Sequence, residues 1–350
     1  MVQQSPKSGA FLHELNSLST VAFIPKAVFA VTSQGNDIYT AMTRIVVASL
    51  RLTNPRITLV VACDPDTNRI IRQVRDPLID EVDDWIMVDT PPGNAHFRNR
   101  FVKTRLRAVI DGPFLFLDSD VLVRGDLSEL FAADTDIAGA RNHSRMAFSE
   151  QVWDKDVAAI EAMGWQTDDR VYVNGGVLFL NNTPGTYRFS TDWHQRWLES
   201  TDKLARYRDQ PALNAALSHI QPRLMVLPDR FNAQFKVTPS VAHNAVIWHY
   251  YSSSENLAHT PFELLTAELV HGAKLDLGRI AAMVKNQHPW RRDSMIDDWA
   301  AAGIIRRGQF DGWESAWLLR EMRGYLSHRL RDEWRRVRRA FGLSSRRRHD

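Results

Sequence analysis

Apolar runs alternate with amphipathic segments over the first third of the chain. Continuous apolar runs predict strands whose two faces are both covered, at residues 27–32, 56–64, 84–89 and 113–120. The segments between them carry apolar residues at helical spacing and predict helices at residues 37–52, 67–76 and 98–111. Because strands that alternate with helices form parallel sheets, this region is expected to be a doubly wound, nucleotide-binding half.

Beyond residue 120 the pattern is less regular. The predicted strands lie at 136–140, 171–182, 223–228 and 245–251, and the predicted helices at 126–131, 191–201, 209–220 and within the polar stretch 142–170. From Pro261 onward the chain is mainly helical. We expect an α/β fold with a mostly parallel, Rossmann-like sheet flanked by helices. The expected units are an N-terminal lead (1–25), a central domain (26–260, with halves 26–125 and 126–260) and a helical, basic C-terminal extension (261–350).

Charge is concentrated in the last part of the sequence. Residues 320–348 hold eleven arginines against three acidic residues, a balance of +8, which leaves −5 for the rest of a chain with net charge +3. A basic end on an acidic body indicates an anionic partner surface and argues against a nucleic-acid-binding protein. From Leu326 onward, aromatic and arginine residues at helical spacing favour association with an anionic membrane. For the half nearest Trp313, a helix packed on the central domain is the favoured alternative.

The location expected from these patterns is the cytoplasm, at the periphery of the inner face of the membrane. No apolar run approaches the ~20 residues that a membrane-spanning helix needs, and the first residues lack the pattern of a signal peptide. The single cysteine, Cys63, cannot form an internal disulfide, so the sequence makes no demand for an oxidising compartment.

Two aspartates follow a strand that is predicted to be buried, in the segment FLFLDSDVLV. Asp118 and Asp120 lie at its carboxyl end, where ligands bind in parallel sheets. Two carboxylates this close repel each other unless a cation or strong hydrogen bonds compensate, and oxygen ligands suit Mg²⁺ or Mn²⁺. The alternative is a helix cap and a solvated turn, although Asp126 is the better candidate for a cap.

Four segments in order give the sequence a family resemblance. They are VFAVT with the helix after it, LDSDVLV followed by RGDLSELF, VNGGVLFLNN, and DQPALNAAL. Together they resemble the GT-A glycosyltransferases of family eight, over about two thirds of the chain from Ala27 to His249. The resemblance implies a GT-A fold, transfer of a sugar from a nucleotide-sugar donor, most simply a UDP-sugar, and retention of anomeric configuration. It makes residues 126–260 the acceptor and catalytic half.

The same resemblance assigns roles to single residues near the nucleotide and the metal. Asp118, Asp120 and His249 would bind Mn²⁺ or Mg²⁺, and Asp118 would also touch the ribose. A structural histidine is the alternative for His249, and His288, in the later QHPW, is a second candidate ligand. The family's Lys-Pro-Trp segment, which supplies a lysine to the diphosphate, is absent after His249, where the chain reads YYSSSEN.

Further residues would contact the donor. Ala30 and Thr32 would lie near the base, and Ser119 and Lys103 near the rest of the nucleotide sugar, with a solvated helix residue as the alternative for Lys103.

At the donor sugar the resemblance places Asn174 and Gly175, followed by Asp209 and Gln210. A glycine pair inside a strand is explained by close approach of a ligand or by a β-bulge. Asp209 and Gln210 would be the catalytic pair, facing the anomeric carbon, where a carboxylate or amide oxygen can stabilise oxocarbenium character. A plain helix cap is the alternative for Asp209.

The acceptor is expected to be a glycan or a lipid-linked glycan. Residues 142–170, with Trp153 and Trp165, form the predicted wall for it, unless these tryptophans belong to the core. Two other functions stay open from the sequence. One is a haloacid-dehalogenase-type phosphatase with Asp118 as nucleophile and Asp120 as acid and base. The other is a degenerate GT-A protein that binds a nucleotide or a membrane without turnover.

Overall fold

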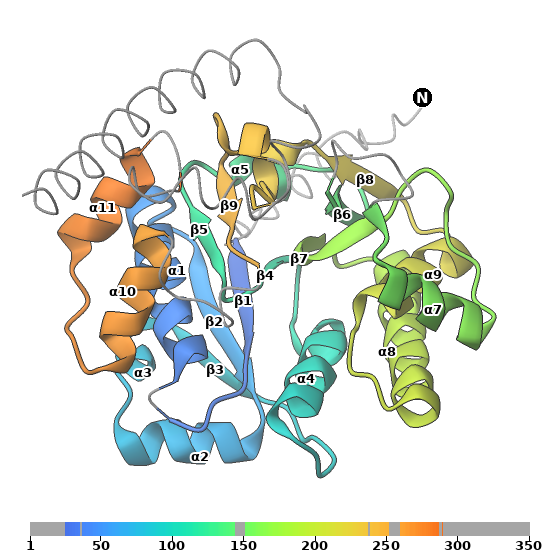
Figure 1. Cartoon of the computed structure of the whole chain (residues 1–350), viewed down its shortest axis with the longest axis horizontal. Coiled ribbons are helices and arrows are strands. Elements are labelled where there is room, and N and C mark those ends of the chain that lie inside the picture. Colours follow the sequence, from blue (N-terminus) through green and yellow to red (C-terminus); the bar gives the residue numbers. More distant parts are fainter. Residues whose placement is uncertain are drawn as a thin grey trace, which may run out of the picture.

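The computed structural model describes residues 25–35, 37–143, 151–236, 239–251, 260–286 and 289. A seven-stranded sheet runs through this part of the chain, in the order β3-β2-β1-β4-β7-β6-β8 (Figure 1). The strands are β1 (Lys26–Val31), β2 (Thr58–Cys63), β3 (Asp84–Met87), β4 (Phe114–Leu117), β6 (Ile137–Arg141), β7 (Val173–Leu180) and β8 (Leu224–Leu227). Only β7 is antiparallel to its neighbours, so the predicted, mostly parallel sheet is confirmed.

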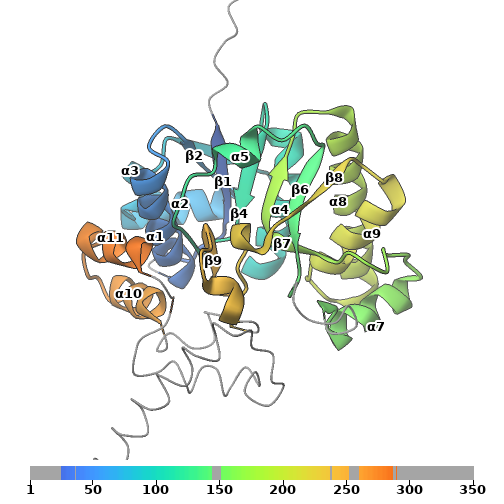
Figure 2. The ribbon, with the colours of Figure 1, turned by 90° about the horizontal axis from the view of Figure 1, so that it is seen from above.

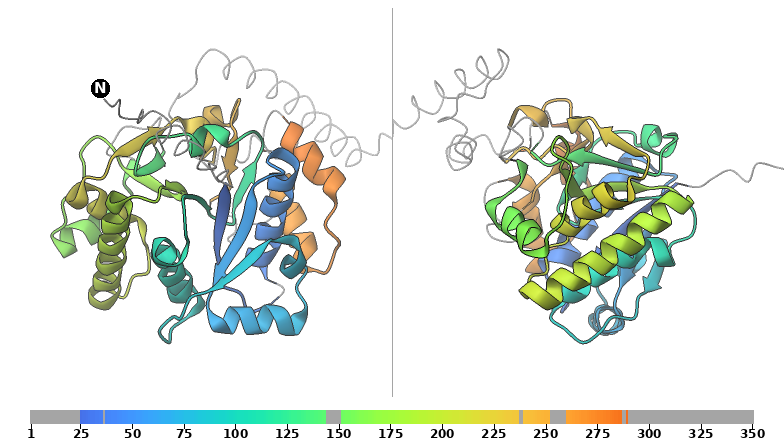
Figure 3. Two further views of the ribbon diagram at one scale, coloured as in Figure 1. Left: turned by 180° about the vertical axis from the view of Figure 1, so that it is seen from behind. Right: turned by 90° about the vertical axis from the view of Figure 1, so that its right-hand side faces the viewer.

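Helices cover both faces of this sheet (Figure 2). The longer ones are α1 (Ile38–Thr53), α2 (Pro65–Val74), α4 (Ala95–Val109), α7 (Asp154–Met163), α8 (Pro184–Leu204), α9 (Gln210–Ile220), α10 (Pro261–Val270) and α11 (Leu277–Lys285). Short elements are α3 (Leu78–Glu81), α5 (Ser128–Phe131) and the 3-10 turns η2 (Asp229–Phe231) and η3 (Pro239–Ala242). Helices α1, α2 and α3 pack on one face, and α4, α8 and α9 on the other, with α8 crossing its outside (Figure 3).

Helix α1 is apolar on two sides, and each side packs against a different layer. Val46, Val47 and Leu50 face the sheet, whereas Met42 and Ile45 belong to a second core cluster that includes α10 and α11. Asp37 begins the helix by accepting hydrogen bonds from the backbone N–H groups of the second and third residues. The first part of the predicted extension, to residue 286, is thus helical and packs on the body of the protein.

A second, two-stranded sheet brings the end of the chain's central part back to the aspartates. After β4 the chain turns through Asp118–Asp120 and continues as β5 (Val121–Val123), which pairs antiparallel with β9 (Ile247–His249). Val121 lies opposite His249 in this register. His249 is therefore brought next to Asp120 by the backbone of two short strands.

Several predictions lie outside the described residues. They concern the N-terminal lead to residue 24, His288, Trp313, and the tail from Leu326 with its arginines. Within the part of the chain that the structure describes, every helix is too short or too polar to cross a membrane.

Candidate active site

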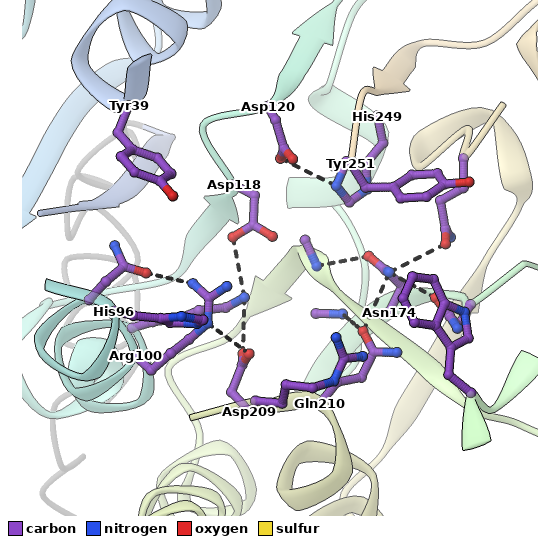
Figure 4. Close-up of a pocket in the computed structure, with 18 of the residues that line it drawn as sticks. Tyr39, His96, Arg100, Asp118, Asp120, Asn174, Asp209, Gln210, His249 and Tyr251 are labelled. Atoms are coloured by element: carbon purple, nitrogen blue, oxygen red, sulfur yellow. Dashed lines mark hydrogen bonds and ion pairs between the residues drawn. The ribbon is translucent and has the colours of Figure 1, made fainter. Parts of the chain in front are cut away.

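A cavity of about 550 Å³ opens at the carboxyl ends of β1 and β4 (Figure 4). Its walls come from the start of α1, from α4, β7, β9 and from the start of α9. Most of the predicted site residues line it: Thr32, Lys103, Asp118, Asp120, Asn174, Gly175, Asp209, Gln210 and His249. The structure thus brings together side chains that are up to 217 positions apart in the sequence, as the order of the motifs predicted.

Asp118, Asp120 and His249 form one wall of the cavity. One oxygen from each aspartate and one ring nitrogen of the histidine all lie within 4.8 Å of one another. His249 Nε2 is 3.3 Å from Asp120 Oδ1. Two carboxylate oxygens and an imidazole nitrogen are suitable ligands for a divalent cation, so these residues could hold one. The cap alternative fails, because Asp126 accepts the hydrogen bond from Ser128 N at the start of α5.

Gly176 provides the space for this group. A Cβ atom at Gly176 would lie 2.4 Å from His249 Cε1 and 3.0 Å from Asp118 Oδ2. At Gly175, by contrast, a Cβ would make ordinary contacts of 3.5 Å or more with Leu213, Lys103 and Asp209. The pairing of β6 with β7 also shifts register at the glycine pair. The pair therefore lies at a bulge, and Gly176 leaves room for the side chains of Asp118 and His249, whereas the close approach of a donor sugar to the backbone stays a prediction.

Asp209 lies on the opposite wall and is held by two cations. Its side chain makes no capping hydrogen bond to α9. Instead Oδ1 is 3.0 Å from Arg100 Nε, and Oδ2 is 3.0 Å from Lys103 Nζ. Burial would raise the pKa of Asp209, but the charges of Lys103 and Arg100 outweigh burial and lower it to about 2. Asp209 is consequently a fixed carboxylate and not a helix cap.

Lys103 connects the two walls. Besides Asp209, it contacts Asp118, with Nζ 3.2 Å from Oδ1, and its side chain is only 3% exposed. The alternative of a solvated helix residue is therefore wrong for Lys103. Arg100 lies one helical turn before it on α4 and was missed by the sequence analysis, although the spacing of three residues would place both cations on one face.

Polar amides form the floor of the cavity near Asn174. Gln210 Oε1 lies 3.4 Å from both Gly175 N and Asn174 Nδ2. Asn174 also contacts Asn142, Gln234 and Asn232, and Asn232 contacts His249 Nδ1 at 2.8 Å. Asn232 and Gln234 come from the segment DRFNAQF, in which no pattern distinguished them from ordinary loop residues.

The third side of the cavity, at the end of β1, contains the residues predicted to lie near a base. Thr32 Oγ1 is buried and has no hydrogen-bond partner among the described residues. Ala30 presents its backbone oxygen to Asn99 Nδ2 at 2.9 Å. Tyr39, whose ring is on the cavity side of α1 and 47% exposed, is a further wall residue that the sequence analysis missed. Ser119 accepts a hydrogen bond from Thr43 Oγ1 at 2.9 Å and does not line the cavity.

Trp153 and Trp165, the two predicted acceptor residues, have different surroundings. Trp153 lines the cavity, and its Nε1–H donates to His143 Nε2 at 3.0 Å. Its ring is stacked on His143 and lies 5.0 Å from Lys155 Nζ and 5.2 Å from Arg208 Cζ. Trp165 packs against the core beside α8 instead. Only Trp153 is therefore on the predicted wall.

Residues 113–256 match the family model described as glycosyl transferase family 8. The matched segment begins at β4 and includes Asp118, Asp120, Asn174, Asp209 and His249. Over these residues the chain is similar to the glycosyltransferases of family 8. The match supports the predicted GT-A glycosyltransferase and gives no support to the phosphatase alternative.

The chain also resembles solved structures. One is a galactosyltransferase, LgtC, in complex with donor and acceptor sugar analogues, at 19% identity and a TM-score of 0.47, covering 72% of this chain and 97% of the other. A second is the glycosyltransferase GlyE of Streptococcus pneumoniae, at 19% identity and a TM-score of 0.47, covering 76% of this chain and 65% of the other. A third is mouse xyloside xylosyltransferase 1, at 14% identity and a TM-score of 0.44, covering 65% of this chain and 97% of the other. A comparison with curated proteins finds no match.

Proposed function

We propose that this glycosyltransferase moves a sugar from a nucleotide-sugar donor, in the first instance a UDP-sugar, to a glycan or glycolipid acceptor, with retention and with the help of Mn²⁺ or Mg²⁺. One observation carries the proposal. The possible metal ligands lie on one wall of the cavity, and Asp209, in ion pairs with Arg100 and Lys103, lies on the opposite wall. Lys103 contacts Asp118 on the first wall and Asp209 on the second. Such a cavity can bind a diphosphate on one side and a sugar on the other.

The donor would lie with its base near Ala30, Thr32 and Tyr39. The buried, unpartnered hydroxyl of Thr32 supports this placement, because buried polar groups normally have a hydrogen-bond partner. A bound Mn²⁺ or Mg²⁺, held by Asp118, Asp120 and His249, would supply positive charge to the leaving diphosphate.

Positive charge also comes from the chain itself. Lys103 and Arg100 both line the cavity, so they can take over the charge compensation that relatives obtain from the lysine that is absent after His249.

Asp209 and Gln210 would act on the sugar. With a pKa of about 2 and both oxygens in ion pairs, Asp209 is unsuited to accept a proton at neutral pH. It would instead orient the sugar and hold a fixed negative charge beside the carbon that becomes positive. Gln210 Oε1, at the same wall, is the proposed neutral oxygen next to the anomeric carbon.

The acceptor would enter past Trp153. Because His143, Lys155 and Arg208 surround its ring, this side of the cavity offers polar and cationic groups more than a bare indole face. The arginine-rich tail from Leu326 onward is proposed to bring the enzyme to anionic membranes that carry such an acceptor. Equal binding to anionic vesicles by the full chain and by a chain ending before Leu326 would contradict the proposed membrane role.

A donor screen tests the proposed reaction. The protein is incubated with a panel of nucleotide sugars, with Mn²⁺ or with a chelator, and the products are identified by mass spectrometry. We expect release of a nucleoside diphosphate and a free sugar from UDP-sugars, dependent on the metal and lost in Asp120→Asn. Turnover unchanged by chelation and by this substitution would contradict the proposal.

A further inference from the structure

The amide groups beside His249 form a chain of hydrogen bonds, and backbone groups fix the orientation of this chain at the end remote from His249. We propose that Asn232, itself oriented by Asn174, is a positioning residue that keeps the proton of the His249 ring on Nδ1 and presents Nε2 to the metal ion. This inference rests on the proposed metal-dependent function. It assigns Asn174 a role that acts through the protein rather than on the donor sugar.

The orientation of the Asn174 amide is set by its neighbours. Its Oδ1 accepts a hydrogen bond from the backbone N–H of Gly176 at 2.9 Å, and a backbone N–H can only donate. Its Nδ2 donates to Asn142 Oδ1 at 3.0 Å and to Gln234 Oε1 at 3.3 Å.

These two partners are fixed in turn. The amide nitrogen of Asn142 donates to the carbonyl of Gln151, and that of Gln234 donates to the carbonyl of Arg141 at 3.0 Å. Each side chain must therefore turn its oxygen toward Asn174. A flipped Asn174 would place donor against donor at Gly176 and acceptor against acceptor at the other two sites.

The orientation of Asn174 determines that of Asn232. Because Asn174 Oδ1 accepts, the group 3.0 Å from it must be the amide nitrogen of Asn232. The oxygen of Asn232 then faces His249 Nδ1 at 2.8 Å. An amide oxygen only accepts, so Nδ1 must carry a proton. Nε2, on the side of Asp120 at 3.3 Å, is left as the nitrogen that can offer a lone pair to a cation.

Burial keeps water away from this chain of hydrogen bonds between Asn174, Asn232 and His249, which we call the amide relay. Asn232, Gln234 and His249 are each 3% exposed, so bulk water cannot replace the missing partner if one of them is removed. Asn174 has both amide hydrogens and its oxygen engaged by protein groups, which leaves it little capacity for a sugar hydroxyl. Partners of this kind, one step behind a metal ligand, typically change metal affinity 10- to 100-fold.

The experiment measures Mn²⁺ binding by electron paramagnetic resonance, for the full chain and for two variants of Asn232. Asn232→Leu removes the acceptor, whereas Asn232→Asp keeps an oxygen for Nδ1–H and loses only the donor to Asn174. We expect about 10- to 100-fold weaker Mn²⁺ binding in Asn232→Leu and a clearly smaller loss in Asn232→Asp. The nitrogen hyperfine modulation from a bound imidazole should be present in the wild type and in Asn232→Asp, and lost in Asn232→Leu.

A matched control separates positioning from folding. Asn181→Leu removes an amide at the other end of β7, where Nδ2 donates to the Thr135 carbonyl at 2.8 Å, and should leave Mn²⁺ affinity unchanged. Equal Mn²⁺ affinity and equal nitrogen modulation in the wild type and Asn232→Leu would overturn the proposed role of the amide relay, although the proposed metal site would still be supported. Should Asn232→Leu not fold, loss of nitrogen modulation in Asn232→Asp would overturn it instead. A wild type that binds no Mn²⁺ would overturn the proposed function itself.

Discussion

Asp209 and His249 lie on opposite walls of the same cavity and are fixed by different kinds of neighbour. Asp209 sits between two full positive charges, Lys103 and Arg100, with one cation on each oxygen. His249 has the neutral amide of Asn232 behind it and a carboxylate, Asp120, in front. The first arrangement fixes a charge, and the second fixes the position of a proton.

The difference matters for what each wall can do. A carboxylate held by two cations keeps its charge at any physiological pH, which suits the stabilisation of a developing positive carbon. An imidazole with its proton held at the back keeps a lone pair for a metal at the front. Breaking the first wall should mainly reduce folding stability, and breaking the second should mainly reduce metal affinity.

The largest effect on stability is expected from Lys103→Met. This change leaves buried Asp209 with a single cation and removes the contact to Asp118, so we expect a loss of about 3 kcal/mol in the free energy of unfolding. Urea unfolding measures it. Arg230→Met, which breaks the exposed pair with Glu129, is the control and should cost less than about 1 kcal/mol. Similar losses of stability in both variants would contradict the conclusion that the charges of Lys103 and Arg100 hold Asp209 in place.

For the other wall, Gly176→Ala should reduce Mn²⁺ affinity by about 100-fold, or about 2.7 kcal/mol, because the new methyl group would overlap the His249 ring. Gly175→Ala is the matched control, since its methyl group has room and points toward Lys103 and Asp209. Calorimetric titration with Mn²⁺ compares the two. Equal affinity in both variants would show that the wall of His249 does not depend on this close approach.

A smaller, pH-dependent effect is expected from His143, which stacks on Trp153. Burial, and then the nearby His249, lower the pKa of His143 to about 4, below the ~6.5 of an exposed histidine. The unfolded chain therefore takes up a proton first as the pH falls, so stability is lost between about pH 6.5 and pH 4. The expected loss in the free energy of unfolding between about pH 7.5 and pH 5 is about 2 kcal/mol.

Urea unfolding across this pH range measures the effect as the difference between the wild type and His143→Gln. His194 on α8, with its pKa lowered to about 4 mainly by burial, should contribute a second, separable part. An unchanged pH dependence in His143→Gln would mean that His143 is not held neutral.

The smallest effect is expected from Trp153→Phe. The substitution removes the hydrogen bond to His143 but keeps an aromatic ring next to Lys155. The free energy of unfolding should therefore fall by about 1 kcal/mol. Mn²⁺ affinity should not change, because Trp153 does not touch the three possible ligands. Thermal unfolding and Mn²⁺ titration together test this, and weaker metal binding would place Trp153 within the metal wall.

The sequence predicted Asp209, Asp118 and Asp120 as residues of the site, but it did not predict the residues that surround His249. Asp118 and Asp120 could be predicted because they end a continuous apolar strand, and that strand is β4, as expected. In the parallel half, strands β1 to β4 followed from continuous apolar runs and helices α1, α2 and α4 from helical periodicity, whereas the short α3 was not predicted. Lys103 was predicted to face the site and lines the cavity, but its burial and its contact with both walls depend on packing between α4, β4 and α9.

The amides that hold His249 could not be predicted. Asn232 is 17 residues from His249 and 58 from Asn174, and loop asparagines are common. Its position depends on the pairing of β5 with β9 and on the register shift at the glycine pair, neither of which leaves a periodic signal. Polar residues that serve other polar residues are recognisable only once the fold has brought them together.

The most direct test of the central claim is an anomalous diffraction map from crystals grown with MnCl₂ and UDP. We predict one strong manganese peak coordinated by Asp118, Asp120 and His249 Nε2, with the diphosphate on the side of Lys103. A nucleotide bound in the cavity with no manganese at these three residues would contradict the account.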